Sequence, residues 1–355
     1  MWSLKDSLGE LGQLARSAGA RVTGTMTQSV EHANQTYLGK GKLEELLALR
    51  ASYDTVILDD ELTPSQQRNL EKALGEEIKV IDRPAPILDI FGQRARTREG
   101  RLQVELAQHE YLLHRLAGQW SHLERLGGGI GTRGPGEAQI ETDRRLIRRR
   151  IQRLGRELEE VRQQRSLYRK RRKDQDVSVV ALVGYTNAGK STLFNALTTA
   201  GVAESGQLFS TLDPITRRLR LSGGQTVLLT DTVGFIQKLP TTVVAAFRAT
   251  LEELQDAALV LHVVDITHPN AVEQGRVVEE VMRDLHLEQK PVVLVLNKED
   301  LLPRLDGGSD RTAPLEAVEV LGRGLVVSAV THMGLDRLLV EIEAAVERVV
   351  EVHEP

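Results

Sequence analysis

Residues 184–191 read Gly184-Tyr185-Thr186-Asn187-Ala188-Gly189-Lys190-Ser191, directly after the apolar run 177–183 and before a helical pattern over 192–197. This spacing between a buried strand and a helix is that of a phosphate-binding loop. Its glycines let backbone N–H groups turn toward a β-phosphate, Lys190 can reach the β- and γ-oxygens, and the hydroxyl of Ser191 suits Mg²⁺. The stretch predicts a nucleotide-binding α/β domain over residues 176–355, with Thr192 also beside the nucleotide.

Four more short apolar runs follow in this region, at 226–230, 259–264, 292–296 and 325–327. Such runs, separated by helical patterns, are typical of strands buried in a parallel sheet. The ligand of such a sheet sits outside the carboxyl ends of its strands. The residues next in sequence are therefore candidates for ligand contact, namely Asp231-Thr232-Val233-Gly234, Asn297-Lys298-Glu299-Asp300 and Ser328-Ala329.

Asp300 indicates which base the domain binds. A carboxylate here accepts two hydrogen bonds from the N1–H and 2-amino groups of guanine, and adenine offers neither donor pattern. We expect Asn297 to tie this segment to the phosphate loop, the Lys298 stem to cover one face of the base, and the Ala329 amide to meet guanine O6. Taken alone, residues 297–300 are also consistent with a helix cap. In order with the other motifs they predict GTP and GDP as ligands and argue against an RNA-remodelling enzyme that accepts ATP.

The metal and the γ-phosphate have their own candidates. Asp231 is placed to hold Mg²⁺ through water, and the Gly234 amide to contact the γ-phosphate and lose that contact on hydrolysis. In the segment 209–216 we choose Thr211 over Thr216 as the ligand of Mg²⁺ and the γ-phosphate, a place in a variable surface loop being the alternative. The predicted catalytic residues are Lys190, Thr211 and Gly234, and the predicted metal ligands are Ser191, Thr211 and Asp231.

Phe235 follows Gly234, where many GTPases place a glutamine that orients the attacking water. A phenyl ring cannot do this. We therefore predict slow hydrolysis by the protein alone, on the order of 10⁻⁴ to 10⁻² s⁻¹, and acceleration by a partner that orders the loops or supplies a group.

Residues 1–93 are predicted to form a small α/β domain. Its candidate strands are 21–26, 55–58 and 78–81, and helical patterns at about 40–50 and 64–74 alternate with them. The alternation suggests parallel strands with crossover helices. We expect Arg83-Pro84-Ala85-Pro86 to break the pattern and mark the exit from this domain.

Residues 94–175 are predicted to form a basic helical hairpin. Two apolar seams with alternating spacings of three and four residues, at 102–123 and 147–168, flank a segment rich in Gly and Pro at 127–137. Between Arg94 and Lys173 there are 21 Lys plus Arg against 10 Asp plus Glu, although the whole chain has a net charge of −4. Such a block suggests a phosphate-rich partner, and a solvated helix surface, a spacer or a disordered linker are the plainer alternatives. The predicted fold class is thus α/β, with a Ras-like P-loop GTPase domain preceded by a small α/β N-terminal domain and an antiparallel helical hairpin, and ending in a short helix near 335–350.

The composition of the 355 residues excludes several classes. There is no Cys, which removes disulfides, thiolate nucleophiles and cysteine-bound zinc. No run of about 18 apolar residues and no signal-peptide pattern occur, so we expect a cytoplasmic protein without a membrane span.

The sequence resembles the HflX family of translation-associated GTPases over nearly its whole length. The resemblance rests on 39–45 (Gly39-Lys40-Gly41-Lys42-Leu43-Glu44-Glu45), on Asp89-Ile90-Phe91 followed by arginines, on the loop 127–137, and on Asp231-Thr232-Val233-Gly234-Phe235-Ile236 running to Leu239-Pro240. Because residues 39–42 lack the spacing of a phosphate loop, a turn that starts a helix is favoured there over a second nucleotide site.

The resemblance implies a function on ribosomes. It implies binding to the large ribosomal subunit and ribosomal RNA, with the glycine-rich loop near the peptidyl-transferase centre, and GTP-dependent separation of stalled or idle ribosomes into subunits. We expect a monomer that does not bind DNA. The alternative is a GTP-switched module that binds RNA or protein without separating ribosomes.

Overall fold

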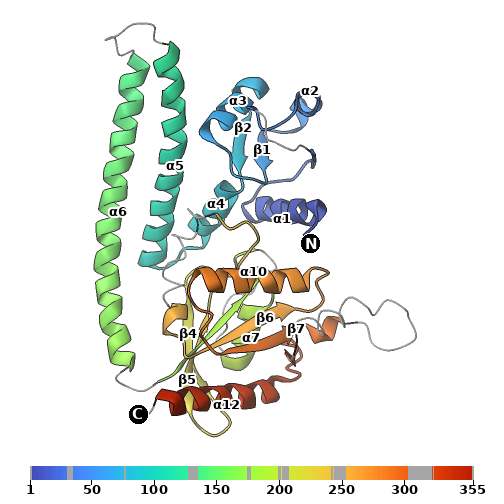
Figure 1. Cartoon of the computed structure of the whole chain (residues 1–355), viewed down its shortest axis with the longest axis vertical. Helices are drawn as coiled ribbons and strands as arrows, with labels where there is room; N and C mark the ends of the chain where they lie inside the picture. Colours follow the sequence, from blue (N-terminus) through green and yellow to red (C-terminus); the bar gives the residue numbers. More distant parts are fainter. Residues whose placement is uncertain are drawn as a thin grey trace, which may run out of the picture.

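The structure is a computed structural model (Figure 1). It describes residues 2–29, 35–75, 77–126, 135–173, 177–198, 201, 208–240, 243, 253–302, 322 and 324–353; in the helices, the side chains of 116–126, 135–140, 166–173 and 350–353 are not described. The predicted glycine-rich loop therefore lies largely outside the described residues, as do the side chains of four predicted seam residues: Leu116, Trp120, Leu123 and Tyr168.

A six-stranded sheet forms the second half of the chain, in the order β4-β5-β3-β6-β7-β8. Its strands are β3 (Val179–Gly184), β4 (Ile215–Arg220), β5 (Thr226–Asp231), β6 (Leu259–Asp265), β7 (Val292–Asn297) and β8 (Leu325–Val326). All neighbouring pairs are parallel except β4 and β5. The five predicted strands are confirmed. The edge strand β4 was not predicted, because half of its residues are exposed arginines that interrupt the apolar pattern.

Helices cover both faces of this sheet. On one face, Val179, Ala181 and Val183 of β3 belong to a buried cluster that includes α10 (Ala271–Asp284). On the other, Val180 and Leu182 belong to a cluster with α7 (Lys190–Thr198) and α12 (Leu335–His353). A short 3-10 helix, η3 (Glu299–Leu301), follows β7. Successive side chains of a strand point to opposite faces, so an unbroken apolar run can serve both layers.

The first part of the chain is a smaller α/β arrangement. It comprises α1 (Leu4–Ser17), α2 (Lys40–Ala48), η1 (Arg50–Ser52), β1 (Thr55–Leu58), α3 (Pro64–Leu74), β2 (Lys79–Asp82) and α4 (Pro84–Arg94). Strands β1 and β2 are parallel and α3 connects them, as predicted. Helix α3 begins with a capping box, in which Thr63 and Gln66 satisfy each other's backbone N–H groups.

Two predictions for this part are wrong. Residues 21–26 form no strand, and most of their side chains are exposed. A strand of this sheet would bury the side chains on one of its faces, and these residues do not. Pro84 and Pro86 do not end the structure but open α4. Proline is tolerated in the first turn of a helix because the N–H groups there have no partner within the helix.

Helices α5 (Arg98–Leu126) and α6 (Pro135–Lys173) run antiparallel beside the rest of the molecule (Figure 1). Leu102, Leu154 and Leu158 form a buried seam between them, as the spacing predicted. Arg165, a charged residue within the predicted second seam, forms ion pairs of 3.2 Å with both Glu99 and Glu253. No helix in the described part of the chain is both long and apolar enough to cross a lipid bilayer.

Candidate nucleotide and metal site

The phosphate loop lies at the carboxyl end of β3 and frames a cavity of about 270 Å³. Gly189 adopts a φ of +92°, and a Cβ there would lie 2.3 Å from the side-chain nitrogen of Asn297. Only glycine fits this crossing of two segments. The cavity is lined by Thr186, Asn187, Gly189, Lys190, Ser191, Thr192, Phe209, Ser210, Thr211, Thr232 and Gly234.

Lys190 places its ammonium group at the centre of the loop. Its Nζ donates to the carbonyl oxygens of Gly184 and Tyr185, at 3.1 and 2.9 Å. Burial lowers the pKa of Lys190 to about 8, although the nearby Asp231 opposes this shift. A buried ammonium group with one nearby carboxylate favours the binding of an anionic ligand in the cavity.

Three oxygen-bearing side chains meet beside Lys190. Oδ2 of Asp231 accepts hydrogen bonds from the hydroxyls of Ser191, at 2.7 Å, and Thr211, at 2.9 Å. The two hydroxyl oxygens are 2.9 Å apart. Thr216 is not part of this group, because it lies in β4 and its hydroxyl contacts that of Thr230 at 2.9 Å. The structure thus brings together the three predicted metal ligands.

The surroundings of the Asp231 carboxylate suit the binding of a cation. Its side chain is fully buried, and burial raises its pKa in spite of Lys190. Among the residues that the structure describes, no donor reaches its second oxygen, Oδ1. Hard oxygen donors with an orphaned carboxylate oxygen fit Mg²⁺, which prefers such ligands and completes its shell with water and phosphate.

The segment after Asp231 is tied to the phosphate loop. The N–H of Thr186 donates to the carbonyl of Phe235 at 2.7 Å, and the N–H of Phe235 donates to the carbonyl of Gly184 at 3.1 Å. A Cβ on Gly234 would lie 2.6 Å from Cα of Thr186 and 3.0 Å from Nζ of Lys190, so Gly234 borders the cavity where only a glycine fits.

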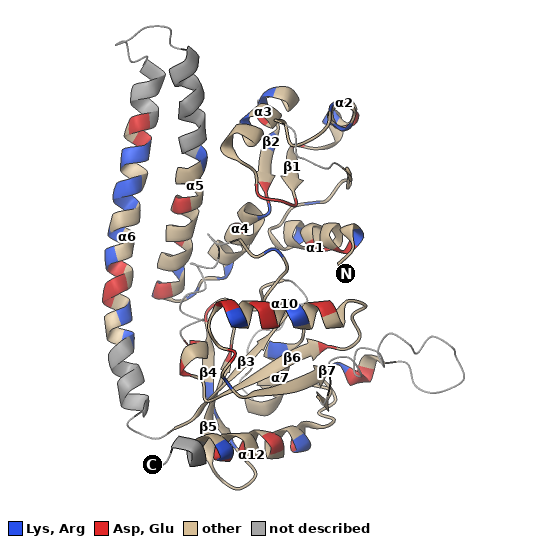
Figure 2. Ribbon diagram, viewed as in Figure 1, with Lys and Arg blue, Asp and Glu red and all other residues tan. Residues whose placement is uncertain are grey.

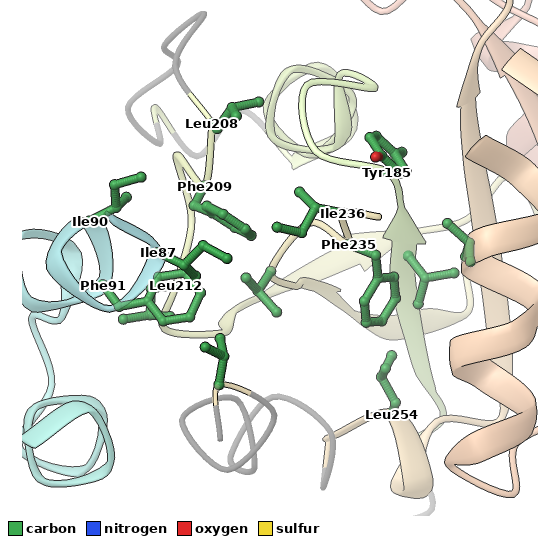
Figure 3. Close-up of a cluster of buried hydrophobic side chains, with 14 of the residues drawn as sticks. Ile87, Ile90, Phe91, Tyr185, Leu208, Phe209, Leu212, Phe235, Ile236 and Leu254 are labelled. Atoms are coloured by element: carbon green, nitrogen blue, oxygen red, sulfur yellow. The ribbon is translucent and has the colours of Figure 1, made fainter. Parts of the chain in front are cut away.

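The side chains that flank Gly234 in sequence form contacts of other kinds. The hydroxyl of Thr232 donates to the carbonyl of Leu182 at 2.5 Å, and Val233 is buried. The ring of Phe235 is 1% exposed and points into a hydrophobic cluster toward Leu254 (Figure 3). Phe235 thus contributes packing and supplies no side chain to the cavity.

The predicted base-binding segments also meet. Nδ2 of Asn297 donates to the carbonyl of Ala188 at 3.0 Å, which ties β7 to the phosphate loop in the way expected. The hydroxyl of Ser328 donates to Asp300 at 2.6 Å and orients that carboxylate. The N–H of Ala329 donates to Oδ1 of Asn297 at 3.1 Å, so a contact with guanine O6 would share this hydrogen.

Sequence reasoning missed Asp265, which ends β6. Its carboxylate accepts a hydrogen bond from Nζ of Lys298 at 2.7 Å and fixes the side chain expected to cover the base. The rule that ligand residues follow the strands could have found it, since Asp265 occupies that position on β6.

A second missed group links the phosphate loop to the first part of the chain. The hydroxyl of Tyr185 donates to Glu10 of α1 and accepts from the backbone N–H of Gln237 at 2.8 Å. Glu10 also forms an ion pair with Arg83, whose guanidinium is 1% exposed and donates to the carbonyl of Gln237 at 3.0 Å. No local pattern signals such contacts, because they join distant parts of the sequence.

Together, the doubly wound sheet, the phosphate loop and the segments around it define a P-loop GTPase. Family models match three successive parts of the chain: GTP-binding GTPase N-terminal at residues 5–92, GTP-binding GTPase Middle Region at 94–172, and 50S ribosome-binding GTPase at 179–298. GTPase HflX of Caldanaerobacter subterraneus is 50% identical over 351 residues, which cover 98% of this chain and 79% of that protein. The chain belongs to the HflX family of GTPases, as its motifs indicated.

Two further comparisons concern the family and the fold. GTPase HflX of Escherichia coli is 48% identical over 308 residues, which cover 85% of this chain and 72% of that protein. The crystal structure of SsGBP in complex with GDP matches 96% of this chain and 95% of its own, with a TM-score of 0.50 and 23% identity. At that identity the likeness concerns the fold.

Proposed function

We propose that this chain is a Mg²⁺-dependent GTPase that binds the large ribosomal subunit and separates stalled or idle ribosomes into subunits. The observation that carries the enzymatic part is the meeting of Ser191, Thr211 and Asp231 beside Lys190. These three side chains would hold Mg²⁺, directly or through water. The ion would neutralise charge on the β- and γ-phosphate oxygens.

The chain's own residues would position GTP in this site. Lys190 exchanges its bonds to the loop carbonyls for phosphate oxygens, and the Gly234 amide donates to the γ-phosphate. Asp300, held by Ser328, accepts the guanine donors. Because the Phe235 ring is buried in the core, no side chain at that position orients the attacking water. Hydrolysis by the protein alone is therefore slow, and ribosomes stimulate it.

Helix α6 supplies a surface suited to ribosomal RNA. Figure 2 shows Lys and Arg residues, with acidic residues among them, along the described part of this helix. Five of its arginines are exposed: Arg145, Arg148, Arg149, Arg153 and Arg156. Exposed guanidinium groups attract phosphates at long range and release counterions on binding. The match of residues 179–298 to a family described as 50S ribosome-binding GTPase supports the same partner. We infer a cytoplasmic monomer that responds to stalled translation.

The test is single-turnover GTP hydrolysis with and without large ribosomal subunits. We expect stimulation that falls steeply with salt and that is lost when Arg145, Arg148 and Arg149 are replaced by Gln. The matched control replaces Arg337 and Arg348, which are exposed on α12, and should behave as the wild type. Fast turnover without ribosomes, or equal stimulation of both variants, would contradict the proposal.

A GTP-switched binding module is the second candidate. It would use the same arginines to bind RNA or protein and would not separate ribosomes. Only the first candidate predicts that assembled ribosomes become free subunits.

A further inference from the structure

The residues around Thr211 rest on the first part of the chain. We call residues 208–214 the Thr211 segment. Its apolar side chains Leu208, Phe209 and Leu212 are buried and join the cluster that contains Ile87, Ile90 and Phe91 of α4 (Figure 3). The rings of Phe91 and Phe209 meet edge to face, with centroids 4.9 Å apart. Thr211 lies between Phe209 and Leu212 in the sequence. It therefore reaches the metal site from a segment that packs against α4.

Asp213 fixes the same segment to the start of α5. Its Oδ2 accepts the backbone N–H groups of Arg96, at 2.7 Å, and Thr97, at 2.9 Å. Its Oδ1 accepts the hydroxyl hydrogen of Thr97 at 2.5 Å. The Thr97 hydroxyl in turn accepts the N–H of Gly100 at 2.9 Å and so caps the helix. One carboxylate from the Thr211 segment thus completes the N-terminal cap of a helix that lies more than a hundred residues earlier.

Gly100 makes room for this carboxylate. It is buried in the first turn of α5, and a Cβ there would lie 2.2 Å from Oδ1 of Asp213 and 3.1 Å from Oγ1 of Thr97. Glycine is a poor helix former compared with alanine. Its presence at this position matches the need for Asp213 to enter the first turn.

We propose that Asp213 is a positioning residue for GTP hydrolysis, which sets the place of Thr211 by gripping the first turn of α5. The inference rests on the proposed Mg²⁺-dependent GTPase function. One residue, Leu212, lies between Asp213 and Thr211, so their Cα atoms are at most about 7 Å apart along the chain. The hydroxyl of Thr211 already lies 2.9 Å from both Ser191 Oγ and Asp231 Oδ2.

This arrangement couples the helix pair to the nucleotide. Displacement of α5 when the helix pair binds a partner would shift Thr211 at the metal site. Conversely, a γ-phosphate that engages Thr211 would favour the capped start of α5. Thr211 is predicted to contact Mg²⁺ and the γ-phosphate, so GDP binding should depend little on Asp213.

The experiment measures single-turnover GTP hydrolysis, its Mg²⁺ dependence and GDP affinity on the full chain. We expect Asp213→Ala and Gly100→Ala to slow hydrolysis about tenfold, which corresponds to the free energy lost with a good helix cap. Both variants should need a higher Mg²⁺ concentration for half-maximal rate. Their affinity for GDP should be unchanged. Asp213→Asn retains an acceptor and should recover most of the rate. Gly155→Ala on α6 is the matched control, because nothing lies within 4 Å of its added Cβ, and should equal the wild type.

A double variant separates positioning from general stability. If Asp213 acts through Thr211, Asp213→Ala causes no further loss in a Thr211→Ala background. Wild-type rates in Asp213→Ala and Gly100→Ala, or losses that multiply in the double variant, would overturn the inference. Absence of Mg²⁺-dependent hydrolysis in the wild-type chain would instead refute the proposed function, so the two failures are distinguishable.

Discussion

Replacing Arg83 by Met should destabilise the first part of the chain strongly. The guanidinium is 1% exposed, pairs with Glu10, and donates to Asp59 at 2.5 Å and to the carbonyl of Gln237 at 3.0 Å. Methionine keeps an apolar stem and removes the charge. Asp59 would keep Lys238 at 2.8 Å, whereas Glu10, 7% exposed, would lose its cation. The loss of stability therefore comes mainly from Glu10, which stays buried without a cation beside it.

The magnitude follows from that unpaired carboxylate. Removing one partner of a buried ion pair costs about 3–5 kcal/mol of unfolding free energy. Burial already raises the pKa of Glu10 with Arg83 present, and without Arg83 the pKa rises further. A carboxyl whose folded pKa exceeds its unfolded value destabilises the fold as pH rises through the folded pKa. The deficit of Arg83→Met relative to the wild type is therefore larger at pH 8 than at pH 5.

Urea unfolding followed by Trp2 fluorescence measures this effect, because the ring of Trp2 lies 5.9 Å from that of Tyr185. A Trp120→Phe background leaves Trp2 as the single tryptophan of the chain. Adding Glu10→Gln to Arg83→Met should restore most of the loss. Arg50→Met breaks the exposed 3.4 Å pair with Glu77 and should cost less than about 1 kcal/mol. Equal losses in Arg83→Met and Arg50→Met, or no rescue by Glu10→Gln, would refute the reasoning.

Three further predictions concern the site and its sheet. Asp300→Asn should shift preference from guanine toward xanthine nucleotides, and unchanged GTP binding by calorimetry would contradict the role of this carboxylate. Ser191→Asn should weaken Mg²⁺–GTP binding and abolish hydrolysis while the unfolding midpoint of the nucleotide-free protein stays the same; retained ribosome-stimulated hydrolysis would count against the metal site. Burial lowers the pKa of His262 to about 4 from 6.5, so the folded state resists protonation. Stability should fall by about 2 kcal/mol from pH 7 to pH 5 through this group, and His262→Gln should show a correspondingly smaller fall in urea unfolding.

The sequence predicted the parts of the fold whose signal is local. The buried strands of the large sheet are short apolar runs, and α3 coincides with the helical pattern at 64–74. Strand β4 escaped prediction because its arginines face solvent at the edge of the sheet. The prolines of 83–86 were interpreted as a break, although the same residues can open a helix.

The residues of the site also fall into two groups, those with a local sequence signal and those without one. The phosphate loop, Asp231 and the Asn297–Asp300 segment were predictable, because each follows a strand whose pattern is evident. Asp213, Gly100 and Arg83 were not, since their roles depend on partners more than fifty residues away. Such contacts arise from tertiary packing and leave no periodic trace in the sequence.

Sedimentation of purified ribosomes in sucrose gradients tests the central claim most directly. With this protein and GTP, or with a non-hydrolysable GTP analogue, we predict that assembled ribosomes convert to free subunits, and that GDP or the Ser191→Asn variant leaves them assembled. Ribosomes that stay assembled with GTP while the protein co-sediments with the large subunit would contradict the claim and favour a binding module.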